Sequence, residues 1–176
     1  MSRVEPSDAE PSGIARDGKG DVMIGKRALE VEAVSASGYP QRFRERVLPR
    51  NVRKLGDAFG LTGVGVSHVT IHPGKESSVR HSHTQEDELV YVLEGELVLR
   101  TNHGEEPLSA GMVVGFRAGD GNAHQLVNRS AADAVFLVVS NRHPDDTADY
   151  PDEDLAVKKD GSGRHVFSRK NGEPCE

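Results

Sequence analysis

Residues 80–96, RHSHTQEDELVYVLEGE, join two closely spaced histidines to an alternating apolar segment. On a β-strand, residues i and i+2 face the same side about 7 Å apart, so His81 and His83 present both imidazoles to one surface. Glu88 follows His83 by five positions, an odd offset that would place it on the opposite face of a continuous strand. We therefore expect a turn at residues 84–87 that brings Glu88 back towards the two imidazoles.

Similar strand patterns extend on both sides of this stretch. From Gly63 to Asn141, runs of five to eight residues rich in Val, Ile, Leu and Thr alternate with Gly, Pro, Asn or Asp. Asn102-His103-Gly104 has the composition of a hairpin tip, because Gly104 can adopt a positive φ. Short strands at even spacing are typical of an antiparallel sandwich or barrel, so the sequence predicts an all-β barrel over residues 61–143.

Three segments flank the predicted barrel. Residues 1–22 are too polar to bury much surface, which predicts a flexible N-terminal arm. In residues 23–60 the runs LEVEAV and RFRERVL alternate weakly, which suggests short edge strands, and VRKLGDAFG suits one helical turn ended by Gly60. Residues 144–176 form an acidic tail that we expect to pack on the outside of the barrel, with HVFSRKNG as a final edge strand.

Composition excludes several classes of function. The formal net charge is −6, so the long-range field that attracts nucleic acid or an anionic membrane is missing. No segment approaches the roughly 18 apolar residues needed to span a bilayer, and no export signal is visible. Cys175 is the only cysteine, which excludes an internal disulfide and argues against a thiol nucleophile. These features predict a soluble cytoplasmic protein.

Two segments resemble the motifs of the cupin superfamily. HSHTQEDELVYVLEG, preceded by Gly74, is similar to the first motif, HxHxxxxExxxxxxG. GMVVGFRAGDGNAHQLVN is similar to the second, with Arg117 in place of the usual proline and two additional residues at 120–121. The positions of the second motif that match are Gly111, Gly119, His124 and Asn128. Other segments further resemble small bacterial single-domain cupins described as sugar phosphate isomerase-like; they are RKLGDAFGLTGVGV, YVLEGELVL, HQLVNRS and DYPDEDL.

The resemblance implies a cupin-type double-stranded β-helix, or jelly-roll, in which four side chains bind one metal ion. They are His81, His83, Glu88 and His124. Independently, three imidazoles and a carboxylate suit a divalent transition metal (Mn, Fe, Co, Ni, Cu or Zn) and not Ca²⁺, which needs six to eight oxygens. Glu86 or Asp87 stays open as the acidic ligand in place of Glu88, and the sequence leaves the identity of the metal open.

Four further residues are candidates for acid–base catalysis or substrate binding near such an ion. His68 and His72 share a strand face and could act as acid–base catalysts, although ordinary hydrogen-bonded histidines look the same in sequence. Arg80 and Arg117 could clamp an anionic substrate near the mouth of the barrel, although both could equally be surface charges.

Three functions fit this pattern. The first is a metalloenzyme with isomerase, epimerase or lyase chemistry on a small polar substrate that chelates the ion through oxygens. The alternatives are an Fe-dependent dioxygenase and a non-catalytic module that binds or senses a small molecule, because fold alone does not decide function. Residues 1–60 show no helix-turn-helix, which disfavours a DNA-binding regulator. The alternating stretch at residues 24–46 lacks a core of its own and predicts a homodimer.

Overall fold

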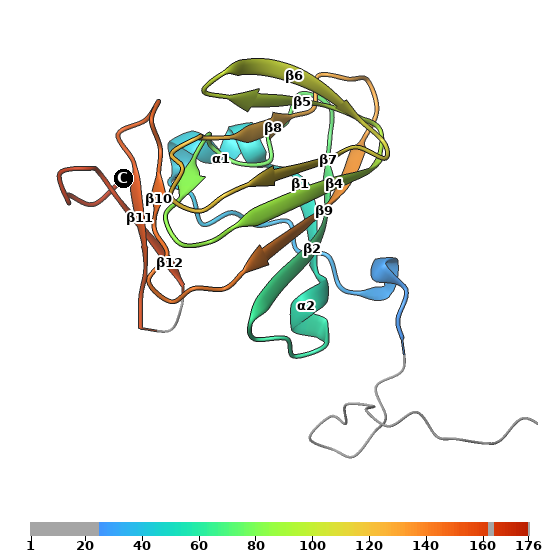
Figure 1. The fold of residues 1–176 in the computed structure, drawn as a ribbon, viewed down its shortest axis with the longest axis horizontal. Coiled ribbons are helices and arrows are strands. Elements are labelled where there is room, and N and C mark those ends of the chain that lie inside the picture. The colour runs from blue at the N-terminus through green and yellow to red at the C-terminus, as the bar shows by residue number, and fades with distance from the viewer. Residues whose placement is uncertain (1–24, 162–163, 176) are drawn as a thin grey trace, which may run out of the picture.

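The computed structural model describes residues 25–161 and 164–175, so the arm predicted at residues 1–22 lies outside the described part. Short helices and longer antiparallel strands follow one another as labelled in Figure 1. No helix within these residues is both long and apolar enough to cross a bilayer. The helices are η1 (Ala28–Glu30), α1 (Gln41–Val47) and α2 (Leu55–Ala58). The strands are β1 (Arg50–Lys54), β2 (Val64–Ile71), β3 (Ser82–His83), β4 (Glu88–Glu94), β5 (Glu96–Thr101), β6 (Gly104–Ser109), β7 (Val113–Phe116), β8 (Gln125–Val127), β9 (Ala134–Asn141), β10 (Ala148–Asp149), β11 (Ala156–Lys159) and β12 (His165–Ser168).

Two antiparallel sheets wrap around one apolar core and form the barrel (Figure 1). The first has the strand order β1-β2-β9-β4-β7, and the second has the order β6-β5-β8. Alternation on β4 follows the sequence: Val90 and Val92 are buried in the core, whereas Leu89 and Tyr91 are exposed. The prediction of an all-β barrel is confirmed.

The segment before the barrel differs from its prediction. Residues 41–47, read in the sequence as part of an alternating strand, form the helix α1. Phe43 and Val47 are four residues apart, so a helix places both on one face, where they are 3% and 0% exposed. Burial of this pair outweighs the weak period-two pattern of the surrounding charges. The helical turn predicted before Gly60 is confirmed as α2.

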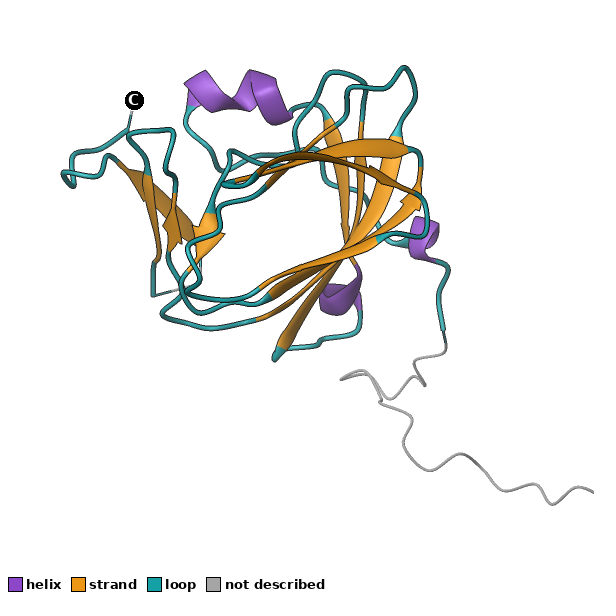
Figure 2. Cartoon of the chain, turned by 45° about the horizontal axis from the view of Figure 1, so that its top comes forward, coloured by secondary structure: helices purple, strands orange, loops and turns teal. Residues whose placement is uncertain are grey.

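The acidic tail forms a third sheet, with the order β12-β11-β10-β3, that closes one end of the barrel (Figure 2). Its strands pack with α1 around a second apolar core that includes Tyr39, Val79, Tyr150 and Leu155. As predicted, the final strand β12 lies at an edge of its sheet. The sequence predicts only that this tail lies outside the barrel. Because β10 pairs with β3, the tail also reaches the strand that carries His83.

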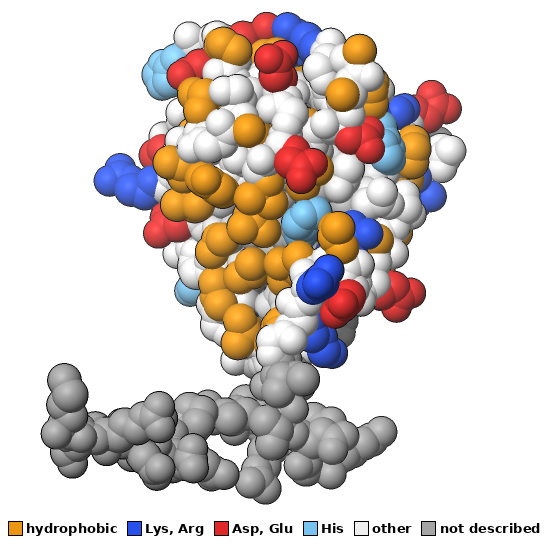
Figure 3. Space-filling view, turned by 90° about the vertical axis from the view of Figure 1, so that its right-hand side faces the viewer, with side chains coloured by type: hydrophobic (Ala, Val, Ile, Leu, Met, Phe, Trp, Pro, Cys, Tyr) orange, Lys and Arg blue, Asp and Glu red, His pale blue; other side chains and the backbone are white. Residues whose placement is uncertain are grey.

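One face of the molecule carries a gathering of apolar side chains among scattered charges (Figure 3). Large apolar residues exposed among the described ones include Leu61, Leu89, Tyr91, Met112 and Val113. No partner chain is described with this one, so the homodimer stays a prediction.

Candidate metal centre

Local backbone structure brings the two histidine motifs together. His81 and His124 form an isolated antiparallel bridge, in which each backbone N–H donates to the other residue's carbonyl, at 3.1 and 2.7 Å. Directly paired residues point their side chains to the same side of a sheet. His83 follows on β3, and the chain turns before Glu88 opens β4, as the spacing predicts.

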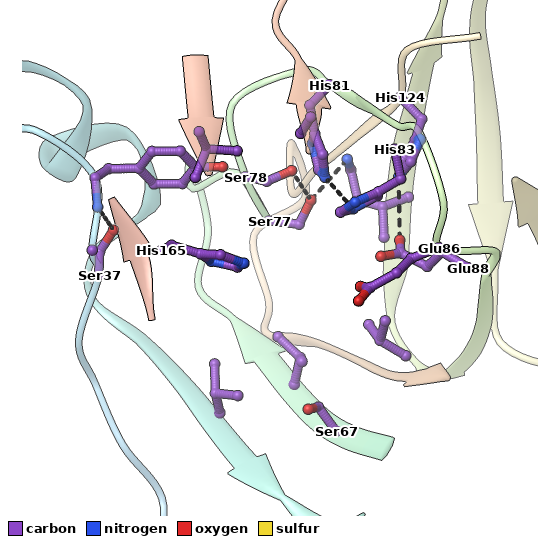
Figure 4. Close-up of a pocket in the computed structure, with 18 of the residues that line it drawn as sticks. Ser37, Ser67, Ser77, Ser78, His81, His83, Glu86, Glu88, His124 and His165 are labelled. Atoms are coloured by element: carbon purple, nitrogen blue, oxygen red, sulfur yellow. Dashed lines mark hydrogen bonds and ion pairs between the residues drawn. The ribbon is translucent and has the colours of Figure 1, made fainter. Parts of the chain in front are cut away.

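The four predicted ligands line one cavity and approach one another in two pairs (Figure 4). The Nε2 atoms of His81 and His83 lie 3.1 Å apart, and His124 Nε2 lies 3.2 Å from Glu88 Oε1. The rings of His81 and His124 are 4.9 Å apart, centre to centre. His124 is held from behind by Phe116, whose ring stacks on the imidazole at 3.6 Å.

Hydrogen bonds define which nitrogen of each paired imidazole is free. His81 Nδ1 lies 2.8 Å from the carbonyl oxygen of Val79, and His83 Nδ1 lies 2.7 Å from Asp146 Oδ2. Both partners accept hydrogen bonds, so both Nδ1 atoms carry a proton, and Nε2 is the nitrogen of each ring that faces the site. Burial, and then the charges of His124 and His83, lower the pKa of His81 to about 3, so this ring is neutral near pH 7.

This donor arrangement fits a metal ion. The Nε2 atoms of His81 and His83 face each other, and a cation bound to both nitrogens would stabilise this close approach. Two nitrogens bound at about 2.1 Å and at right angles to one ion would lie about 3 Å apart, close to the distance between the two Nε2 atoms. Burial raises the pKa of Glu88, but the hydrogen bond and charge of His124 outweigh it, so the pKa is lowered and the group stays a carboxylate.

Asp146 is a residue of the site that sequence reasoning missed. It is 4% exposed, accepts hydrogen bonds from the backbone N–H groups of Gln85 and Glu86 at 2.9 and 3.2 Å, and orients His83. Burial raises the pKa of Asp146, but these hydrogen bonds lower it by more than burial raises it. The pKa therefore lies below its usual value, and the carboxyl group is ionised. In the sequence it is one acid of an acidic tail, and no spacing distinguishes it.

Within the described residues, the group whose ligand atoms all lie within 4.8 Å of one another is a different one, formed by His83, Glu86 and Asp146. The carboxylates of this grouping already have partners. Glu86 pairs with Lys159 at 2.5 Å and accepts the backbone N–H of His143, and Asp146 accepts three donors. We therefore assign Asp146 the role of orienting His83, and keep Glu88 as the candidate for the acidic ligand.

Replacement of Asp146 by asparagine is expected to weaken metal affinity about 10- to 100-fold, because a carboxylate behind a ligating histidine fixes its tautomer and raises its basicity. Competition with a chromogenic chelator measures the change. Asp145→Asn, at the exposed neighbouring position, is the matched control and should bind metal like the unchanged protein. Equal affinities for the two variants would contradict the role of Asp146.

A cavity of about 380 Å³ opens beside the four converging side chains. Apolar residues of the barrel, including Leu126, Phe136 and Val138, form part of its wall. The tail supplies Tyr150, His165 and Phe167, and Figure 4 shows the His165 imidazole pointing into the cavity. The site is therefore a shared product of the barrel and the C-terminal sheet.

The predicted acid–base residues do not lie on this wall. On β2, Ser67 and Val69 line the cavity, so His68 between them faces the other side of the sheet, opposite Arg53 on β1. His72 lies beyond the end of β2, where Nδ1 contacts Asp133 at 2.7 Å. The strand face that His68 and His72 were predicted to share therefore lies outside the barrel. We do not retain either histidine as an acid–base catalyst.

The predicted arginine clamp is also absent from the cavity wall. Arg80 makes a two-pronged ion pair with Asp152, both distances being 2.7 Å, and also contacts Asn102. It ties the tail to a hairpin. Arg117 lines a shallow depression between strand ends on the outside, together with residues such as Val64 and Asn141. Neither arginine is retained as a substrate ligand.

Comparisons with known proteins agree with this architecture. Residues 67–140 match the cupin domain family. No curated protein sequence gives a significant match. The crystal structure of a cupin-superfamily sugar phosphate isomerase from Silicibacter pomeroyi is 44% identical, with a TM-score of 0.82, over 87% of this chain and 97% of that one. A protein from Acidithiobacillus ferrooxidans, assigned provisionally as a sugar phosphate isomerase, is 34% identical, with a TM-score of 0.64, over 69% of this chain and 77% of that one.

A more distant structure shares the fold alone. The polyketide cyclase RemF from Streptomyces resistomycificus is 22% identical, with a TM-score of 0.57, over 68% of this chain and 80% of that one. The two motifs, the jelly-roll architecture and the similarity across nearly the whole length of the Silicibacter protein agree with one another. The chain is a member of the cupin superfamily.

Proposed function

We propose that this protein is a metal-dependent enzyme that isomerises a small polar substrate able to chelate the ion through two adjacent oxygens. The observation that supports this most is that His81, His83, Glu88 and His124 line one cavity large enough for such a molecule, as two close pairs. The sugar phosphate isomerase assignments of the two more similar structures support the same class of reaction.

A divalent ion held by these four side chains would polarise a carbonyl oxygen of the substrate and acidify the neighbouring C–H group. The apolar part of the wall limits access of water to the reacting atoms, which strengthens electrostatic interactions within the cavity. Phe116 and Asp146 keep the rings of His124 and His83 in position before substrate arrives.

His165 is our candidate for the group that moves the proton. It lies on β12, exposed on one side and facing the cavity on the other (Figure 4). Partial burial, and then the charge of Lys159, lower the pKa of His165, so the neutral imidazole is available to accept a proton near pH 7. In this proposal His165 has the acid–base role that the sequence suggested for His68 or His72.

Replacement of His165 by glutamine is expected to lower turnover about 100-fold, at the lower end of what general acid–base catalysis contributes. Metal content should not change, because His165 is not one of the four ligands. His103→Gln, at the exposed tip of the β5–β6 hairpin, is the matched control. Unimpaired turnover in His165→Gln would remove this residue from the reaction.

The proposal itself is tested by removing the metal. Turnover of sugar phosphates from a substrate panel should disappear after treatment with a chelator and return with one of the divalent transition metals. Full activity in a metal-free sample would refute the proposal. Oxygen uptake by the iron-loaded protein, with no isomerised product, would instead favour a dioxygenase.

A further inference from the structure

Arg50 is a cation of the cavity that the metal centre does not use. It opens β1, and together with Val52, two residues on, it lines the cavity, as alternation on a strand requires. Arg53 on the same strand pairs with His68 and does not line it. Of the lysines and arginines in the described residues, Arg50 is the one on this wall.

The Arg50 guanidinium has no counterion among the described residues. Nη1 donates a hydrogen bond to the carbonyl oxygen of Ser77 at 2.5 Å, while Nε is buried and has no partner. Burial lowers the pKa of Arg50, yet a guanidinium keeps its charge under all ordinary conditions. Arg50 is half-buried, and an anion that paired with this partly desolvated charge would stabilise it.

The carboxylates of the same cavity do not supply that anion. Glu86 pairs with Lys159, Glu88 with His124, and Asp146 with His83. A negative charge that pairs with Arg50 would therefore come from a bound molecule.

The surroundings of Arg50 suit an oxyanion. Ser37, Ser67, Ser77 and Ser78 line the cavity, and Figure 4 shows them around the space that His165 and Glu86 also face. Serine hydroxyls can donate hydrogen bonds to anionic oxygens. A fork of N–H donors beside several hydroxyls matches the geometry of a phosphate or a carboxylate.

Two tyrosines line the same cavity as Arg50 and the metal centre. The rings of Tyr39 and Tyr150 are 6.2 Å apart, centre to centre. The ring of Tyr150 in turn stacks on His81, with centres 5.7 Å apart. Because Arg50 and the four predicted ligands line one cavity of about 380 Å³, one small molecule there can contact both.

We propose that Arg50 binds the anionic end of the substrate, a phosphate or a carboxylate, while the metal centre holds the oxygens at the reacting end. This inference deepens the proposed function. It rests on that function only in identifying the bound anion as part of the substrate. It also replaces Arg80 and Arg117 as the source of the positive charge.

Calorimetric titration of the full chain with inorganic phosphate and with acetate tests the proposal. Arg50→Gln is expected to weaken binding of the preferred anion about 10- to 100-fold, the range for loss of a charged hydrogen bond. Arg53→Gln is the matched control, because Arg53 lies on the same strand and also has a buried, unpartnered Nε. The preference between phosphate and acetate identifies the class of anion.

Binding of both anions to Arg50→Gln as tightly as to the unchanged protein would overturn the proposal, as would absence of binding to the unchanged protein in the millimolar range. Should Arg50→Gln fail to fold, Arg50→Lys keeps the charge but not the fork, and should show an intermediate loss. Anion binding that persists in His124→Ala while metal is lost separates this proposal from the proposed function. Loss of anion binding only in His124→Ala would place the anion at the metal and overturn the role of Arg50.

Discussion

Replacement of His124 by alanine is expected to reduce metal affinity well over 100-fold, more than loss of a residue behind a ligand, and to abolish turnover. The reason is geometric. His124 comes from the second motif and is the ligand that faces Glu88 at 3.2 Å, so without it three donors remain, all from residues 81–88. Elemental analysis of protein purified without chelator measures the change.

Two controls isolate the metal from the fold. His103→Ala removes an exposed histidine and should keep full metal content. Glu88→Gln keeps the size of the side chain but removes its charge, and should also lose metal. Metal at a concentration 100 times the Kd should stabilise the unchanged protein by about 2.7 kcal/mol and so raise its melting temperature. The melting temperature of His124→Ala should not change when metal is added. Normal metal content in His124→Ala would exclude it as a ligand.

Replacement of Gly95 by alanine is expected to destabilise the fold by about 3 kcal/mol or more, through both strain and overlap. Gly95 joins β4 to β5 with a φ of 77°. A Cβ atom there would lie 2.6 Å from the carbonyl oxygen of Asp133 and 3.0 Å from the Cα of Ala134, so backbone atoms would have to move. The loss is measured by chemical denaturation.

Gly74→Ala separates the two contributions. Gly74 has a similar φ of 75°, but a Cβ there would meet nothing within 4 Å. Its replacement should cost only the backbone strain, about 1–2 kcal/mol. If the two variants lose the same stability, the close approach of Asp133 to the β4–β5 turn is not the reason why position 95 requires glycine.

The parts of the site that lie in regular local patterns could be predicted from the sequence. His81, His83 and Glu88 are separated by offsets that a strand and a turn convert directly into one face, and the paired motifs indicated His124. The alternation of β4 likewise separates Val90 and Val92 from Leu89 and Tyr91, and the structure shows that the first pair is buried. Such patterns depend on local geometry, which the sequence records directly.

The remaining parts depend on contacts between distant segments. Asp146 and His165 come from a tail whose acidic composition suggested only an outer surface, and they reach the cavity because β10 pairs with β3. Arg50 faces the cavity because β1 pairs with β2 in one register, which the sequence of β1 does not specify. His68 fails for the same reason: alternation identified its face but not which face is inside.

Anomalous diffraction from a crystal of the protein purified without chelator, collected at the absorption edge of the metal found by elemental analysis, tests the central claim most directly. The account predicts one peak at about 2.0–2.2 Å from Nε2 of His81, His83 and His124 and from a carboxylate oxygen of Glu88. A peak between His83, Glu86 and Asp146, or no peak in metal-supplemented crystals, would contradict it.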